Sequence, residues 1–94
     1  MPYFVLIYHV GENYIERRTP FRQEHLRLAR QSYERGEMVM GGAFADPPDK
    51  GLLIFRGADR GVAEKFAKND PYVLNGLVAT WEVRPWTVVI GGAE

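Results

Sequence analysis

The sequence contains no cysteine, and this absence excludes disulfide bonds, thiolate metal sites and a cysteine nucleophile. It also lacks an excess of charge, because 12 Lys and Arg residues balance 12 Asp and Glu residues. A chain with no net charge and no basic run gives no electrostatic reason to bind nucleic acid or an anionic membrane. We therefore predict partners other than nucleic acid and lipid.

Long apolar runs are missing as well. No stretch approaches the roughly 20 residues that span a bilayer. The first apolar run lacks the basic flank and the small-residue cleavage site of a signal peptide. We therefore expect a cytoplasmic protein.

Histidine is scarce, with His9 and His25 as its only occurrences. Zinc and related metals need several His, Cys or carboxylate ligands together, and no such cluster stands near either residue. The sequence therefore predicts neither a metal site nor a cofactor.

The pattern of apolar residues predicts one domain over residues 1–94, with the βαββαβ order of the ferredoxin-like fold. The predicted strands are residues 3–10, 38–44, 51–56 and 77–84. One predicted helix begins with a Thr19 N-cap and Pro20 and runs to about Arg35. The other is capped by Asp59 and runs to about Asn69. This order predicts an α+β fold with a four-stranded antiparallel sheet and two helices on one face.

The predicted sheet is apolar on both faces. In the first strand Phe4 and Leu6 alternate with Val5 and Ile7, so neither set is polar. An antiparallel sheet with helices on one face normally has a polar second face. A second copy of the same sheet is the simplest cover, so we expect a homodimer.

Two polar residues interrupt the apolar side of the first helix. This side is formed by Phe21, Leu26, Leu28, Ala29, Ser32 and Tyr33. His25 lies in its middle, and Arg22 lies within it. Because an unpaired buried charge costs several kcal/mol, Arg22 needs an anion, a carboxylate partner or a water-filled cleft.

The second helix continues its apolar stripe into a carboxylate. Val62, Ala63, Phe66 and Ala67 form the stripe, and Asp70 follows one turn later. Since both helices pack on the same sheet face, Asp70 is expected to meet His25 and Arg22. A histidine oriented by a carboxylate is a common general acid–base pair.

Each of these residues also has a structural interpretation. His25 fits a hydrogen-bonded core histidine, and Asp70 before Pro71 fits an N-cap. Arg22 fits a side chain that buries its stem and extends its charge to water.

Tyr72 and the pair Gly41-Gly42 also have two interpretations. Tyr72 fits a packed aromatic with its hydroxyl at the surface, or a hydrogen-bond donor at the rim of a cleft. Gly41-Gly42 fits a β-bulge, or a place where a ligand approaches the backbone.

Several motifs occur in an order typical of a known family. They are Tyr3-Phe-Val-Leu-Ile-Tyr8, Arg22-x-x-His25-Leu26, Gly41-Gly42, Asn69-Asp70-Pro71-Tyr72-Val73 with Gly76, and Val83-Arg84-Pro85-Trp86. With them the chain resembles the YciI-like (YCII-related) family of the dimeric α+β barrel superfamily. The resemblance implies a dimer whose two sheets form a barrel, and a His–Asp site at His25 and Asp70 with Arg22 beside it. It also provides a precedent for elimination of chloride from a chlorinated hydroxylated aromatic.

Together these features predict a cofactor-free enzyme of the lyase type, similar to a dehydrochlorinase, or of the isomerase type. His25 and Asp70 form the acid–base pair, and Arg22 anchors an anionic or aromatic small molecule. Tyr72, Gly41 and Gly42 complete the predicted substrate site. The alternatives are a non-catalytic module that binds a small ligand and a structural dimerisation domain.

Overall fold

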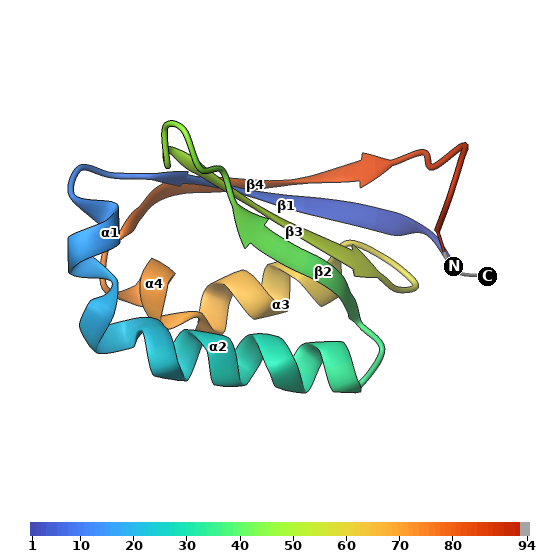
Figure 1. Ribbon diagram of the computed structural model, residues 1–94. Coiled ribbons are helices and arrows are strands. Elements are labelled where there is room, and N and C mark those ends of the chain that lie inside the picture. Colours follow the sequence, from blue (N-terminus) through green and yellow to red (C-terminus); the bar gives the residue numbers. More distant parts are fainter. Residues whose placement is uncertain (93–94) are drawn as a thin grey trace.

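The structure is a computed structural model that describes residues 1–92. Its strands are β1 (Tyr3–Val10), β2 (Met38–Ala43), β3 (Lys50–Arg56) and β4 (Val78–Trp86). Its helices are α1 (Tyr14–Arg17), α2 (Thr19–Glu34), α3 (Gly61–Asn69) and α4 (Pro71–Leu74). The strands pair antiparallel in the order β2-β3-β1-β4, and the helices lie on one side of the sheet (Figure 1). The predicted ferredoxin-like arrangement is therefore confirmed, with α1 and α4 as short additions.

The core lies between the sheet and the helices. In β1, buried residues alternate with half-buried ones, because successive side chains of a strand point to opposite faces. The core members from the sheet include Phe4, Leu6, Tyr8, Leu53, Phe55 and Val83, and those from the helices include Ala63, Phe66, Ala67 and Tyr72.

The opposite face of the sheet is also apolar, as the alternation predicts. Val5 pairs with Ile54, and Ile7 pairs with Leu52, on the side away from the helices. All four are only half-buried in the single chain. This surface, which we call the open sheet face, is available to a second protein surface.

The start of α2 differs from the prediction. Thr19 is not the N-cap, because Arg18 precedes it with helical dihedral angles and offers no side-chain cap. The reason is α1, which the sequence pattern did not indicate: its C-cap, Arg18, is also the N-cap of α2, so one helix leads directly into the next. Asn13 before α1 has a positive φ of 59°, a conformation that asparagine tolerates better than most residues.

The strand ends also differ. β4 continues through Pro85 to Trp86, although Pro85 was expected to close it. An edge strand accommodates proline because one side of it forms no ladder hydrogen bonds. In β2 the register shifts between Met38 and Met40, so the irregularity precedes Gly41-Gly42.

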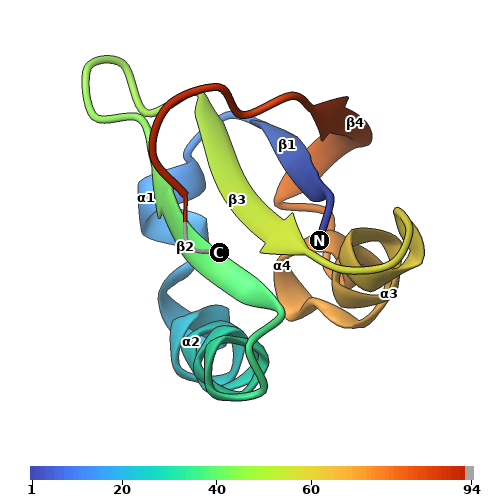
Figure 2. The same ribbon diagram turned by 90° about the vertical axis from the view of Figure 1, so that its right-hand side faces the viewer.

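Only part of the apolar side of α2 is buried against the rest of the chain. Leu26 is 48% exposed and Tyr33 is 58% exposed, whereas Ser32 is buried. Figure 2 shows α2 beneath the β2 edge of the sheet, so the outer flank of the helix faces solvent. Leu26 and Tyr33 thus belong to the apolar side of the helix without being buried in this chain.

Candidate active site

Asp70 occupies the junction of α3 and α4. It is the C-cap of α3 and the N-cap of α4, and its φ of −75° and ψ of 123° turn the chain between them. The backbone N–H of Tyr72 donates to Asp70 Oδ1 at 3.0 Å, and Pro71 begins the new helix. The predicted capping role is present, and the side chain is 0% exposed.

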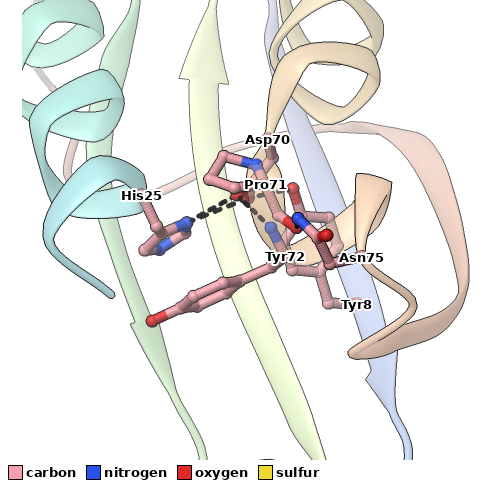
Figure 3. Close-up of polar contacts among 6 residues, drawn as sticks. All are labelled: Tyr8, His25, Asp70, Pro71, Tyr72 and Asn75. Carbon is pink, nitrogen blue, oxygen red and sulfur yellow. Dashed lines mark hydrogen bonds and ion pairs between the residues drawn. The ribbon is translucent and has the colours of Figure 1, made fainter. Parts of the chain in front are cut away.

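The same carboxylate meets His25, as the two interrupted stripes predict. His25 Nδ1 lies 2.9 Å from Oδ1 and 2.9 Å from Oδ2 of Asp70 (Figure 3). The capping role and the contact with His25 therefore coexist in one residue.

Tyr8 is a third member of this group, and the sequence prediction missed it. Its hydroxyl donates to Asp70 Oδ2 at 2.7 Å from the middle of β1 (Figure 3). Burial raises the pKa of the Tyr8 hydroxyl, and the negative charge of Asp70 raises it further. Tyr8 therefore stays protonated as a donor. The signal was the strand alternation, which places Tyr8 on the core face with Leu6, where a tyrosine hydroxyl needs a partner.

These contacts define how His25 is held. A carboxylate only accepts hydrogen bonds, so the nitrogen of His25 that faces Asp70 carries a hydrogen. The other ring nitrogen, Nε2, then has a free lone pair in the neutral ring. Within residues 1–92, Nε2 has no hydrogen-bond partner. His25 thus has one nitrogen fixed by Asp70 and one available.

The ring of Tyr72 fixes the plane of the imidazole. The two rings stack with centroids 3.9 Å apart and planes 8° apart. Tyr72 is 1% exposed, so the prediction of a hydroxyl at the protein surface is wrong. That hydroxyl is buried and has no acceptor for its hydrogen in the described part of the chain.

Burial and nearby charges shift the pKa of the Tyr72 hydroxyl in opposite directions. Burial raises the pKa of its hydroxyl, and Tyr14 adds to this effect. The guanidinium groups of Arg22 and Arg18 lower it in part, and the net shift is upward. The hydroxyl therefore remains protonated at neutral pH.

A cavity of about 230 Å³ opens beside the His25 ring. Arg22 lies on its wall and is exposed rather than buried, so its charge is compatible with this position. Gly41 and Gly42 also line it. Sequence reasoning missed Arg18, which lines the cavity and lies 5.4 Å above the Tyr14 ring. It stands before the predicted helix, where no periodic pattern marks it.

Two kinds of feature are missing from residues 1–92. No group of three or more His, Cys, Asp or Glu side chains is arranged to hold a metal ion. No helix in this range is long and apolar enough to cross a membrane.

The YCII-related domain family matches residues 1–87. The chain belongs to this family. Curated proteins provide no match to the sequence. Solved structures do match the chain, and they give information on its fold.

Three solved structures illustrate that likeness. One is the 5-chloro-2-hydroxyhydroquinone dehydrochlorinase TftG of Burkholderia phenoliruptrix AC1100, in complex with 2,5-dihydroxybenzoquinone. It has a TM-score of 0.75 and 18% sequence identity, and the match covers 90% of this chain and 93% of the TftG chain. Atu4242 from Agrobacterium tumefaciens has a TM-score of 0.61 and 14% identity, over 95% and 94%. An antibiotic biosynthesis monooxygenase has a TM-score of 0.61 and 12% identity, over 96% and 100%. At these identities the likeness establishes the fold, that of the dimeric α+β barrel proteins.

Proposed function

We propose that this protein is a cofactor-free enzyme that eliminates a leaving group from a small molecule or isomerises it, with His25 as the general acid–base. One observation carries the proposal. His25 has one ring nitrogen on a fully buried carboxylate and an unpaired second nitrogen, and its ring lines a cavity. This arrangement suits a base that must be fixed in one tautomer.

The chemistry needs only proton movements. His25 Nε2 takes a proton from a C–H or O–H group of the substrate, and Asp70 stabilises the imidazolium that forms. In an elimination, the electron pair of the broken C–H or O–H bond forms a double bond and the leaving group departs with its own bonding pair. In an isomerisation, the proton returns from His25 to a different atom of the substrate. Neither route consumes an oxidant or a reductant.

The family and the fold support an elimination. TftG is a dehydrochlorinase that shares this fold and was seen with a small quinone. The cavity beside His25, with Arg22 on its wall, fits a small molecule that carries negative charge. We infer a substrate of this kind, with Tyr72, Gly41 and Gly42 at its binding site.

The open sheet face supports a homodimer. Val5, Ile7, Leu52 and Ile54 form a continuous apolar surface across β1 and β3. Two such sheets packed face to face bury these side chains and make the barrel of the superfamily. If the cavity binds a ligand without converting it, the protein is instead a dimeric binding module.

Two assays test the enzymatic proposal. The first incubates the protein with 5-chloro-2-hydroxyhydroquinone and measures chloride. The second incubates it in D₂O with small hydroxylated aromatics and carboxylic acids, and NMR records exchange of carbon-bound hydrogen. We expect one of these activities, and we expect His25→Gln to lower it about 100-fold or more.

His9→Gln is the matched control, because His9 lies on the opposite face of the sheet, 3.9 Å from Glu82. It should retain full activity. Absence of both activities in the wild type, or an equal loss in the two variants, would favour the binding module.

A further inference from the structure

The cavity beside His25 has an unbalanced charge. Arg18 and Arg22 both line it, and no acidic side chain does. Within residues 1–92 neither arginine pairs with a carboxylate, whereas Arg27 and Arg35 of the same region pair with Glu24 and Glu37. Asp70 does not line the cavity, and its oxygens accept hydrogen bonds from Tyr8, His25 and the Tyr72 backbone rather than from either arginine. Two cations therefore face the cavity without an ion-pair partner among the described residues.

A second and independent observation points to a ligand. The Tyr72 hydroxyl is buried in a residue that is 1% exposed and lines the cavity; the Arg22 guanidinium beside it can only donate, so the hydroxyl has no acceptor for its own hydrogen among the described residues. Buried hydroxyls almost always have a hydrogen-bond partner. Figure 3 shows this hydroxyl at the far end of the ring from Asp70, so the Asp70 network does not supply one. A ligand acceptor beside the two arginines would supply it.

The opposite wall of the cavity consists of small residues. Ala43 on β2 pairs with Gly51 on β3, and Gly41 lies two residues away on the same strand. A Cβ atom on Gly51 would lie 3.6 Å from the Cβ of Tyr8, so the backbone itself forms this part of the surface. Leu26, Ala29 and Leu53 add apolar lining. The lining therefore suits a ligand with an apolar body as well as an anionic group.

The spacing along α2 places the two arginines and the histidine on one side of the helix. Arg18, Arg22 and His25 follow one another at intervals of four and three residues, so they share one face. All three line the cavity. A molecule in the cavity can therefore contact an arginine and His25 at the same time.

We propose that the cavity binds a small organic carboxylate, with the carboxylate held by Arg18 and Arg22 and by a hydrogen bond from the Tyr72 hydroxyl. Planar guanidinium groups bind a planar carboxylate through paired hydrogen bonds. The apolar lining favours an organic acid over inorganic phosphate. The proposal names the substrate class for the site of the proposed function, and it concerns binding rather than proton transfer.

The test is an NMR titration with benzoate, benzamide and inorganic phosphate as probes, followed through the side-chain signals of His25 and Tyr72. We expect benzoate to bind about tenfold or more tightly than benzamide, because the amide keeps the shape and lacks the charge. Phosphate should bind more weakly than benzoate. Equal affinities for benzoate and benzamide, or a preference for phosphate, would overturn the proposal. The absence of benzoate binding at about 10 mM would also overturn it, because weak single-site ligands bind at roughly this concentration.

Variants locate the carboxylate. Arg18→Gln and Arg22→Gln should each weaken benzoate binding about tenfold, and Tyr72→Phe should weaken it by a smaller factor. Arg30→Gln is the matched control, since Arg30 is an exposed arginine of α2 outside the cavity. His25→Gln should keep benzoate binding while it lowers the activity about 100-fold or more. If the wild type shows His25-dependent activity but no preference for benzoate over benzamide, the carboxylate site is refuted and the proposed enzymatic function stands. If it prefers benzoate but shows no His25-dependent activity, the enzymatic function is refuted and the carboxylate site stands.

Discussion

Tyr72 and Tyr8 are both buried tyrosines beside Asp70, but only one of their hydroxyls donates a hydrogen bond. Tyr8 donates to Asp70 at 2.7 Å, whereas the Tyr72 hydroxyl has no acceptor among the described residues. The difference separates a hydroxyl that maintains the fold from one that is available to a ligand. It also gives a direct test, because the same substitution can be made at both positions.

Tyr8→Phe should lower the free energy of unfolding by about 1–3 kcal/mol, because it leaves part of a buried carboxylate without a donor. Tyr72→Phe should change it by less than about 1 kcal/mol, or raise it, because a buried hydroxyl without an acceptor is removed. Urea unfolding at neutral pH measures both. A larger loss in Tyr72→Phe than in Tyr8→Phe would contradict the hydrogen-bond assignment.

High pH should destabilise the protein. The pKa values of Tyr8 and Tyr72 are raised in the folded state, mainly by burial. Above about pH 10, the ordinary tyrosine value, the unfolded chain loses these protons while the folded chain keeps them. The unfolded state then binds fewer protons, so the free energy of unfolding falls as pH rises.

Tyr8→Phe should make this pH dependence shallower. One fewer retained proton reduces the slope by about 1.4 kcal/mol per pH unit above pH 10. Urea unfolding between pH 8 and pH 11, with wild type and Tyr8→Phe compared, measures the slope. Tyr33→Phe is the control, since Tyr33 is 58% exposed and should leave the slope unchanged. Identical slopes in wild type and Tyr8→Phe would show that Tyr8 ionises freely in the folded protein.

The contact between His25 and Asp70 could be predicted because it follows from periodicity. Each residue interrupts an apolar stripe, and helices on the same sheet face bring their stripes together. The contact of Tyr8 with Asp70 could not be predicted in the same way. Alternation indicates that Tyr8 points inward, but its partner is 62 positions away and depends on where α3 ends.

Arg18 was missed for a different reason. It lies at the junction of α1 and α2, and a helix of four residues such as α1 is too short to show periodicity. The exposure of Leu26 and Tyr33 could not be predicted either, because periodicity defines a side of a helix without defining how much of it the sheet covers. That limit depends on the position of α2 under β2, which is a tertiary property (Figure 2).

The open sheet face predicts a dimer. Sedimentation or light scattering at micromolar concentration should give about twice the 10.7 kDa mass of the chain. Leu52→Glu should produce the monomer, because it places a charge in the centre of the apolar face. Leu74→Glu is the control, since Leu74 is 67% exposed on α4, on the other side of the sheet. A wild-type monomer under these conditions would refute the dimer.

Asp70→Asn tests the role of the carboxylate in orienting His25. Asparagine caps helices about as well as aspartate, so α4 and the fold should persist. The carboxylate accepts a hydrogen bond from His25 Nδ1, whereas the amide group of asparagine can donate to that atom. The ring proton should therefore move to Nε2, which removes the free lone pair from the nitrogen that faces away from residue 70.

Nitrogen-15 chemical shifts of the imidazole distinguish the two tautomers. In wild type we expect the proton on Nδ1 of His25, and in Asp70→Asn we expect a shift toward Nε2 with a fall in activity of about 10⁴-fold, as for a histidine base held in the wrong tautomer. His9 supplies the internal control, because its environment on the other sheet face does not change. If the tautomer of His25 is the same in both proteins, Asp70 serves only as a helix cap, and the acid–base assignment loses its physical basis.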